Sequence, residues 1–569
     1  MIKGIIASQG IAIGQAFKLE EIIFNVKKRI INDPVKEIER LDKSIAYAIE
    51  ELTRIRDYTI HTLGKEQGEI FNAHILVAKD PDLMSQVKVL IQNEKINAEY
   101  ALKEVRDRFI TLFENMENEY MKERTSDILD VTNRILAILL EQKSNDISKI
   151  TEESIVISHD LTPSNTAQMN KGLIKGFITN IGGRTSHTAI MARSLEIPAL
   201  VGTKNVMAQV KHGDFLILDA IEGHVMINPS QKEIEYYKEK LIQFEEEKLS
   251  LKQLKDQETR SIDGVKVELG ANIGTIFDLK SAIEYGAEGI GLFRTEFLYM
   301  DREDFPSEDE QFMAYKTVLE KMEGKPVIIR TLDIGGDKFL PYLNMPQELN
   351  PFLGYRAIRL CLDRKDIFKT QLRALLRASI YGSLRIMFPM IALVEEFIEA
   401  KAFLLEVKEE LIKEGYDVNS KIEIGMMVEI PSAALLADQF AKVVDFFSIG
   451  TNDLIQYTFA ADRMNEHVAY LYQPYHPSIL RLIKNVIDSA HQEHKWVGMC
   501  GEMAGDDIAV PILLGLGLDE YSMSAISILK TRQLIGKLSK KEMEVLTNDV
   551  LKLSNTNDVV KLVKSKLNR

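Results

Sequence analysis

The sequence predicts a multidomain α/β protein in which an α/β domain with an inserted helical bundle precedes a C-terminal (β/α)8 barrel. Its 569 residues are too many for one ordinary domain. Short apolar strand patterns lie on both sides of a long block of helical periodicity in the first 230 residues. Beyond residue 263 a strand-then-helix rhythm repeats about eight times, which is typical of a (β/α)8 barrel.

Composition narrows the class of protein before any motif is considered. Hydrophobic residues make up 45% of the chain and charged residues 27%, as in globular proteins. The formal charge of −14 argues against nucleic acid or an anionic membrane surface as the main partner, and leaves room for a basic protein. Two cysteines, Cys361 and Cys500, offer no disulfide framework. With no signal peptide or apolar run of membrane-spanning length, we expect a cytoplasmic protein.

The α/β domain is expected in two pieces, residues 1–20 and 146–229, with a helical insertion at 21–145. Glycines alternate with apolar residues from Ile2 to Leu19, which favours strands joined by tight turns. Asp33-Pro34 then has the pattern of a helix start, and apolar residues follow at spacings of three and four. Strands return as the short runs IVIS, GFIT, ALVG, FLILDA and HVMINP.

A single polar helix is predicted for Ser230 to Glu258, within a linker at 230–260. Ser230 and Glu233 have the spacing of a capping box. The apolar stripe is narrow, and consists of Ile234, Tyr237, Leu241 and Phe244. Such a helix is either a solvated surface element or a linker that also packs along one domain.

The barrel is expected over residues 261–569. The candidate strands are Val265–Leu269, Gly289–Phe293, Pro326–Arg330, Leu384–Phe388, Ile424–Glu429, Asp445–Ile449, Trp496–Cys500 and Asp519–Ser522. Polar motifs follow most of them, at the strand ends where barrel enzymes build their active sites.

One stretch in the α/β domain has the pattern of a phosphate site. Gly182 and Gly183 form a turn, followed by Arg184, two hydroxyl residues and His187 at the start of a predicted helix. Free backbone amides and the helix dipole favour an anion at such a position. A neutral His187 there could accept a phosphoryl group whose oxygens Arg184 binds. The alternative is a polar helix start with one capping histidine.

The predicted barrel mouth collects charged residues that suit a small anion and a cation. Arg294, Arg330 and, from longer loops, Arg356 and Arg463 suit a ligand with several negative charges. Glu429 and Asp453, on adjacent strands, could share Mg²⁺. Taken singly, each arginine could instead be a surface ion-pair partner.

These motifs carry a resemblance that covers at least 500 residues. GGRTSHTAIMARSLEIPALVG resembles the phosphohistidine signature shared by enzyme I of the bacterial phosphoenolpyruvate:sugar phosphotransferase system, phosphoenolpyruvate synthase and pyruvate phosphate dikinase. RTLDIGGDK, NPFLGYRAIR, IGMMVEIPSA, DFFSIGTNDLIQYT and GMCGEMAGD resemble their phosphoenolpyruvate-binding barrel. A mild departure is Ile430, where threonine is expected in relatives.

The resemblance implies a role for each site residue. His187 would be the phosphoryl acceptor, supported by Thr166, Gly183 and Arg184. Arg294, Arg330, Asn452 and Arg463 would bind phosphoenolpyruvate with Arg356 assisting, while Glu429 and Asp453 bind Mg²⁺. Cys500 would protonate the enolate as a thiol, although a small buried apolar role is the alternative for it. Cys361, inside an apolar run, is expected in the core.

The arrangement of domains favours enzyme I among the three. The two ATP-using relatives carry a nucleotide-binding domain of several hundred residues, and this chain has no Walker-type loop. The expected reaction transfers the phosphoryl group of phosphoenolpyruvate to His187 and then to a histidine of the carrier protein HPr. The resemblance implies HPr docking on the helical insertion, with Glu66, Glu69, Asp80 and Asp82 as plausible contacts, and a homodimer formed through the barrel.

Two other functions stay open from the sequence alone. One is an ATP-dependent pyruvate phosphotransferase and the other a regulatory relative without enzymatic activity. In the favoured function, His187 must visit the barrel mouth and the helical dock in turn, which predicts a rigid-body swing about hinges near the linker's ends.

Overall fold

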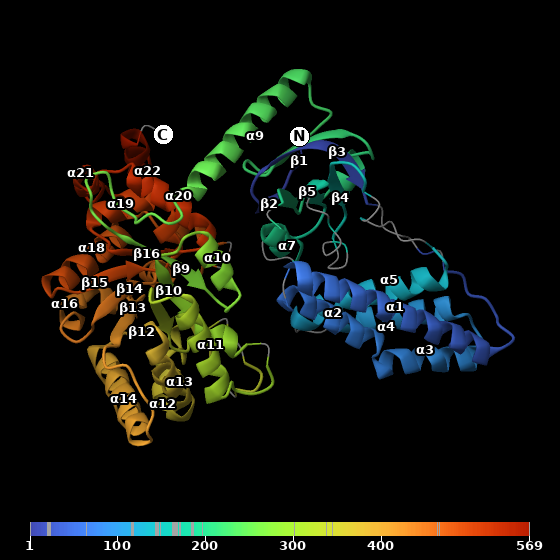
Figure 1. The fold of residues 1–569 in the computed structure, drawn as a ribbon, viewed down its shortest axis with the longest axis horizontal. Helices are drawn as coiled ribbons and strands as arrows, with labels where there is room; N and C mark the ends of the chain where they lie inside the picture. Colours follow the sequence, from blue (N-terminus) through green and yellow to red (C-terminus); the bar gives the residue numbers. More distant parts are fainter. Residues whose placement is uncertain are drawn as a thin grey trace. The chain divides into compact units, whose positions relative to one another are not determined.

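A computed structural model of the chain describes residues 2–567 apart from 20–23, 25, 64, 115–118, 143–146, 148–149, 162–164, 166–168, 170–171, 184–186, 196, 301, 337, 339, 344, 347, 464 and 466 (Figure 1). For residues 58, 61–63, 65–67, 69–70, 114, 119–124, 126, 187, 190 and 194 it describes the backbone alone. The chain divides into two compact units, Met1–Glu247 and Lys248–Arg569. Among the described helices, none combines the length and the apolar character that a membrane span requires.

The N-terminal unit contains an eight-stranded sheet in the order β1-β8-β7-β3-β4-β5-β6-β2. Its strands are β1 (Ile2–Lys3), β2 (Ile5–Ser8), β3 (Ile11–Lys18), β4 (Ser154–Ser158), β5 (Ile174–Thr179), β6 (Ala199–Val201), β7 (Phe215–Asp219) and β8 (His224–Ile227). Strand β3 lies in the middle, antiparallel to β7 and parallel to β4. The first residues therefore complete a sheet whose other strands come mostly after residue 150, as predicted.

A bundle of helices interrupts this sheet between β3 and β4. The helices are α1 (Pro34–Leu63), α2 (Lys65–Ala78), α3 (Pro81–Glu94), α4 (Ala98–Glu114) and α5 (Glu119–Leu139). They lie beside one another in Figure 1 and share one apolar core that contains Leu41, Val87, Leu102 and Val131, all fully buried. The short helices α7 (His187–Leu195) and α8 (Val206–Gln209) belong to the sheet part of the unit. The predicted helical insertion is confirmed.

The linker helix α9 (Gln231–Lys252) packs its first half on the sheet. Ser230 and Glu233 form the predicted capping pair, with the Ser230 amide donating to Glu233 Oε2 at 2.7 Å. Tyr237 is buried against Ile11 and Ile217 of the sheet, and the Lys240 ammonium donates to Asp219 Oδ2 at 2.8 Å. The helix is thus attached to the α/β sheet by its apolar stripe and by one buried carboxylate.

The helix ends at Lys252, six residues before the predicted end at Glu258. The buried Arg532 explains the difference, because its Nη1 donates to the carbonyls of Leu254 and Lys255, each at 2.9 Å. Its Nη2 donates to the Gly286 carbonyl at 2.6 Å. Arg532 thus holds the carbonyls of the turn that follows α9, and this fixes the end of the linker to the barrel unit.

The C-terminal unit is a closed barrel of parallel strands, as predicted (Figure 1). Its strands are β9 (Glu268–Ile273), β10 (Gly289–Arg294), β11 (Pro326–Arg330), β12 (Ser383–Phe388), β13 (Glu423–Val428), β14 (Phe446–Ile449), β15 (Trp496–Met499) and β16 (Glu520–Met523). The first strand lies later than the predicted Val265–Leu269. The chain first makes a turn at Gly264, where φ is +84°, and Arg260 pairs with Lys266 across it.

Helices and short 3₁₀ turns surround the barrel and bury its outer face. They are α10 (Asp278–Glu284), η2 (Thr295–Leu298), α11 (Glu308–Lys321), η3 (Pro351–Leu353), α12 (Ile358–Asp363), α13 (Lys365–Ala378), η4 (Ser379–Tyr381), α14 (Val394–Lys413), α15 (Pro431–Leu435), α16 (Ala437–Phe440), α17 (Thr451–Phe459), η5 (Ala469–Leu471), α18 (Pro477–Gln492), η6 (Glu502–Gly505), α19 (Ala509–Leu516), α20 (Ala525–Gly536), α21 (Lys540–Val550) and α22 (Thr556–Lys566). Cys361 on α12 is fully buried in this layer, as predicted.

The Lys240–Asp219 pair gives a test of how α9 is held. Burial raises the pKa of Asp219, but the bond from Lys240 and two backbone amides outweigh it, so the net pKa is lowered. Lys240→Met leaves this buried carboxylate without its cation. We expect it to destabilise the N-terminal unit by about 1–3 kcal/mol.

Differential scanning calorimetry of the full chain measures this change, with fluorescence of Trp496 marking the barrel transition. Lys238→Met, which removes an exposed lysine from the same helix, is the matched control. Equal transition temperatures for the two variants would mean that the pair does not hold the helix.

Candidate active site at the barrel mouth

The charged residues predicted for the barrel mouth come from strand ends and from the loops directly after them. Arg294 ends β10 and Arg330 ends β11, while Glu429 and Cys500 come directly after β13 and β15. Asn452 and Asp453 lie in the first turn of α17, after β14. Because all strands of a parallel barrel end at the same face, these side chains share one mouth.

A buried ion network, here called the Asp333 network, lies behind the mouth. Arg330 donates to Glu296 Oε1 at 2.7 Å and lies 3.0 Å from Asp333 Oδ2. Arg356 donates to Asp333 Oδ1 at 2.9 Å. Lys338 donates to Glu296 Oε1 at 2.7 Å and to Asp333 Oδ2 at 3.3 Å. All of these except the partly exposed Lys338 are nearly inaccessible to solvent.

Electrostatics keep the Asp333 network ionised despite its burial. Burial lowers the pKa of Arg330, but the carboxylates of Asp333 and Glu296 face it and raise the pKa above its ordinary value. The pKa of Asp333 is likewise raised by burial and lowered more strongly by Arg330, Lys338 and Arg356. The three cations thus contact Glu296, Asp333 and, through Arg356 at 3.5 Å, Asp453, so their charges are nearly balanced and stay ionised.

Several donors at the mouth are not used within the described part of the chain. Arg294 is half-buried and makes no hydrogen bond or ion pair with any described residue. The Nε atoms of Arg330 and Arg356 are buried without a partner among the described groups. An unpaired buried N–H is costly, and a bound phosphate or carboxylate oxygen would satisfy it.

Asn452 and Arg463 are connected through one tyrosine. The Tyr472 hydroxyl lies 3.4 Å from Asn452 Oδ1, to which it donates, and Arg463 approaches the same hydroxyl. The amide of Glu502 also donates to Asn452 Oδ1, at 3.4 Å. These bonds use the oxygen of Asn452, and its amide nitrogen has no described acceptor.

The two predicted metal ligands, Glu429 and Asp453, form an acidic corner that the arginines compensate only in part, with Arg356 3.5 Å from Asp453 Oδ2. Glu429 is fully buried and accepts a bond from the Met390 amide at 2.6 Å. Burial, together with the facing charges of Asp453 and Asp333, raises the pKa of Glu429 to about 8. Two hard carboxylates whose proximity raises the pKa of Glu429 suit a divalent cation, which would replace the proton.

Cys500 is buried where β15 meets the mouth. Its Sγ lies 3.9 Å from the Ile449 carbonyl, and it packs among barrel-interior residues that include Met427 and Phe446. Burial raises the pKa of the Cys500 thiol to about 11. The group is therefore a thiol at neutral pH, the protonation state that a proton donor needs.

The segment around His187 is described in part. Helix α7 begins at His187, as predicted, and Thr188 Oγ1 donates to the Leu161 carbonyl at 3.1 Å and so fixes its first turn. Gly182 has φ of +112°, the left-handed region that favours glycine, and a Cβ at Gly183 would meet no atom within 4 Å. Thr166 and Arg184 lie outside the described residues, as does the side chain of His187.

Sequence reasoning predicted Glu429 and Asp453 but missed two further acids and one lysine behind the mouth. Glu296, Asp333 and Lys338 lie inside the quoted motifs TEF and RTLDIGGDK, but no role was predicted for them. A usable signal was present, since each strand-end arginine is followed two or three residues later by an acid. Buried arginines require such partners.

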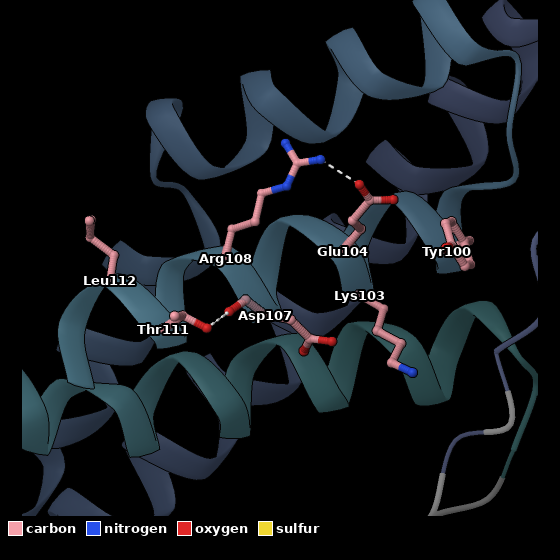
Figure 2. A pocket seen from close by; sticks show the side chains of 7 residues that line it. All are labelled: Tyr100, Lys103, Glu104, Asp107, Arg108, Thr111 and Leu112. Atoms are coloured by element: carbon pink, nitrogen blue, oxygen red, sulfur yellow. Dashed lines mark hydrogen bonds and ion pairs between the residues drawn. The ribbon is translucent and has the colours of Figure 1, made fainter. Parts of the chain in front are cut away.

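Two other features of the N-terminal unit resemble ligand sites and are not part of this centre. A hollow of about 640 Å³ lies along α4 (Figure 2), where Arg108 pairs with Glu104. Asp219, Glu222 and His224 are the one group of three or more clustered metal-ligand side chains among the described residues. The Lys240 ammonium, 2.8 Å from both carboxylates, already occupies the position between them that a cation would take.

Comparison with known proteins agrees with this geometry. Residues 248–540 match the phosphoenolpyruvate-binding domain of the PEP-utilising enzymes, residues 3–124 their N-terminal domain and residues 150–223 their mobile domain. The chain belongs to the PEP-utilising enzyme family. The phosphoenolpyruvate-protein phosphotransferases of Geobacillus stearothermophilus and Bacillus subtilis are each 60% identical to it over 99% of its length. The alignments cover 97% and 99% of those two proteins.

More distant members of the family align just as completely. The phosphoenolpyruvate-protein phosphotransferase of Staphylococcus epidermidis is 56% identical over 99% of both chains. A solution structure of Enzyme I is 44% identical and covers 43% of this chain and all of that one, with a TM-score of 0.39. Near-full-length identity at this level shows membership of the enzyme I branch of the family.

The raised pKa of Glu429 predicts how the metal-free barrel responds to pH. Between about pH 4.3, the ordinary glutamate pKa, and pH 8, the unfolded chain has lost this proton while the folded chain keeps it. The contribution of Glu429 to stability is therefore full below that window and is lost as the pH rises through it, at about 1.4 kcal/mol per pH unit. Glu429→Gln cannot titrate, so its stability relative to wild type should rise by about 3 kcal/mol from pH 5 to pH 8.

Denaturant unfolding in EDTA, followed by the fluorescence of Trp496, measures this difference, because Trp496 is the one tryptophan and lies on β15. Glu406→Gln, at an exposed position on α14, is the control. A constant difference between Glu429→Gln and wild type from pH 5 to pH 8 would contradict the raised pKa.

Proposed function

We propose that this chain is a phosphoenolpyruvate-protein phosphotransferase that moves the phosphoryl group of phosphoenolpyruvate to His187, releases pyruvate, and passes the group to a histidine of HPr. This is the first step of sugar uptake by the phosphotransferase system. The observation that carries the proposal is the cluster of unused guanidinium donors beside an acidic corner and a buried thiol at one barrel mouth. The near-full-length relatives bear the name of this activity.

Phosphoenolpyruvate would be held by its two anionic groups. Arg294, Arg330 and Arg463 supply forked donors for the phosphate and carboxylate oxygens, and Asn452 supplies its free amide nitrogen. Arg356 would hold the Asp333 network in place and offer its Nε. The network fixes Arg330 from behind, so the guanidinium needs little rearrangement when the substrate binds.

Glu429 and Asp453 would hold Mg²⁺, for which their paired, buried oxygens fit. When bound, the ion would neutralise charge on the phosphoryl and enolate oxygens. Glu429 must lose its proton for this, which its pKa of about 8 allows at modest cost in the presence of a dication.

The acceptor is a neutral His187 at the N-terminus of α7. Thr166, Gly183 and Arg184 would support the phosphoryl oxygens once the group is on the imidazole, and the helix dipole favours that negative charge. At the mouth, Cys500 would give its proton to the methylene carbon of the enolate, which yields pyruvate. Its raised pKa keeps the proton in place until the enolate forms.

HPr would dock on the helical insertion, and the chain would act in the cytoplasm as a homodimer formed through the barrel. Of the acidic residues suggested as contacts, Asp80 already caps α3 by accepting the Leu83 amide at 2.8 Å, while Asp82 is exposed. The side chains of Glu66 and Glu69 lie outside the described residues. Exposed acids such as Asp82 support a basic partner, although a solvated helix face explains them as well.

The two alternatives have less support. An ATP-dependent pyruvate phosphotransferase needs a nucleotide-binding domain, and the three family models that match leave no long stretch of this chain for one. A regulatory relative without activity should have lost part of the mouth, and every group that the reaction needs is present in this sequence.

Labelling with radioactive phosphoenolpyruvate tests the proposal. The wild-type chain with Mg²⁺ should acquire acid-labile, base-stable phosphate, and EDTA should prevent this. His187→Ala should take up none while it binds phosphoenolpyruvate as the wild type does, because the binding groups lie in the other unit. Retained label in His187→Ala would remove His187 as the acceptor, and tight binding of ATP by the wild type would favour the dikinase type.

Cys500→Ala separates acid catalysis from packing. A proton donor acts on the transition state, so kcat should fall by about 100-fold or more while KM for phosphoenolpyruvate changes by less than about threefold. Steady-state pyruvate formation with HPr as acceptor gives both constants. Cys361→Ala, which removes the other buried thiol, is the control. A rise in KM alone for Cys500→Ala would assign Cys500 to packing.

A further inference from the structure

The interior of the barrel is divided into an apolar side and a polar side. Side chains alternate along each strand, and the inward apolar cluster contains Leu292, Ile328, Met387, Met427 and Phe446, together with Cys500. On β16 and β9 the alternation instead places Glu520, Ser522, Gly270 and Asn272 inward, and β15 adds Gly498 next to Trp496 of the apolar cluster. A barrel interior is normally filled by branched apolar side chains, so this polar side requires an explanation.

Glu520 of β16 lies at the centre of the polar side. It is 2% exposed, and neither carboxyl oxygen makes a hydrogen bond of ordinary geometry, although the Met499 amide is near. Three glycines make the room for this carboxyl. A Cβ at Gly270, Gly291 or Gly498 would lie 2.4, 2.1 or 2.2 Å from a Glu520 oxygen. Three strands thus have glycine at the positions that surround one buried carboxyl, and this carboxyl makes no hydrogen bond of ordinary geometry and no ion pair with the described residues.

Polar side chains lead from Glu520 to the backbone carbonyl of Cys500, while the Cys500 thiol lies near the Ser448 hydroxyl. A Cβ at Gly291 would lie 2.3 Å from Ser522 Oγ and 2.1 Å from Glu520 Oε1. These two oxygens are therefore at most about 4.4 Å apart. Ser522 donates to Asn272 Oδ1 at 2.6 Å, and Asn272 Nδ2 donates to the Cys500 carbonyl at 3.0 Å. The pairing of Gly498 with Glu520 places Cys500 beside Ser522 across β15 and β16.

The opposite end of this polar side reaches solvent. Glu268 begins β9, is only half-buried, and its charge raises the pKa of Glu520 further. Arg385 of β12 faces both acids and is itself held by Glu423 of β13 at 2.5 Å. Burial keeps the pKa of Glu520 well above its ordinary value, which favours the protonated form of this carboxyl. Cys500 and Met499 of β15 complete its surroundings.

We propose that Glu520 is the acid that returns a proton to Cys500 after each turnover, through Ser522 and the interior of the barrel. This rests on the proposed function. The thiol S–H bond breaks as the C3–H bond of pyruvate forms, and the electron pair of the S–H bond stays on sulfur. Ser522 passes its hydroxyl proton to the thiolate and takes the proton of Glu520. The Glu520 carboxylate then regains a proton from solvent by way of Glu268. Glu520 thus acts through Cys500 and does not itself contact the substrate.

This arrangement allows the buried Cys500 thiolate to regain a proton while the barrel mouth is occupied. A thiolate at Cys500 is strongly disfavoured by its burial, and bound substrate covers the side from which water could reach it. A proton delivered from behind the thiol needs no opening of the mouth. The same relay, run backwards, removes the proton that Cys500 takes from pyruvate when phosphoenolpyruvate is re-formed.

Two isotopes measured together test the relay. The full-length protein is incubated in D₂O with Mg²⁺, phosphoenolpyruvate and carbon-14 pyruvate. Carbon exchange between the two substrates reports the phosphoryl-transfer chemistry, and deuterium in the pyruvate methyl group reports the exchange of the Cys500 proton with solvent. In Glu520→Gln, which keeps the shape but not the acid, deuterium entry per carbon exchange should fall at least fivefold. Damage to folding or binding would lower both rates together and leave their ratio unchanged.

Ser522→Ala gives the same prediction by a second route, should Glu520→Gln not fold. Tyr521→Phe is the matched control, because it removes a buried, unpartnered hydroxyl from the same strand on the face that points away from the interior. Its ratio should equal that of the wild type. Unchanged ratios in Glu520→Gln or Ser522→Ala would overturn the relay. Absence of carbon exchange in the wild type would instead contradict the proposed function.

Discussion

The ion network around Asp333 is the constraint on which the barrel mouth depends. A buried arginine is costly unless its charge is balanced, and breaking a buried ion pair is commonly worth about 3–5 kcal/mol. Asp333 contacts Arg330, Lys338 and Arg356 within 3.3 Å. It therefore fixes the three cations at the barrel mouth, and a change at one of them alters the ion pairs of the others.

The same network sets the protonation of the acidic corner. Asp333 faces Glu429 and raises its proton affinity, while Arg330 and Arg356 oppose that effect. The balance leaves Glu429 with a proton at neutral pH until a cation displaces it. Any anion or cation that bound at the mouth would therefore change the pKa of Glu429, because these charged groups share one buried and poorly screened volume.

The polar side of the barrel extends this coupling inward from the mouth. Cys500 belongs to the apolar interior cluster through its side chain and to the polar side through its carbonyl, which accepts from Asn272. Three glycines and one uncompensated carboxyl replace the packing that a barrel usually has there. Such an arrangement lowers stability and is explained better by proton movement than by folding.

Much of this protein could be read from local sequence. The order of strands and helices, the capping pair at Ser230, the helix start at His187 and the positions of Arg294, Arg330, Glu429, Asp453 and Cys500 at strand ends follow from periodicity, turn residues and motif resemblance. These features depend on residues that are close in the sequence, so sequence patterns are sufficient to predict them. The end of α9 could not be predicted, because it is set by Arg532, about 280 residues away.

Tertiary structure decided how the groups pair and which face each one presents. The sequence places Glu296, Asp333 and Lys338 near the arginines, but only the pairing of β10 with β11 and the folding of the loop after β11 bring them within hydrogen-bonding distance. In the same way, the sequence gives no sign that Glu520 is special. Its burial among three glycines of other strands is visible only in the folded barrel. The sequence by itself determined which chemical groups stand at each strand end. The folded barrel decided their burial, and with it their charge, because the cost of an ion depends on what the whole chain packs around it.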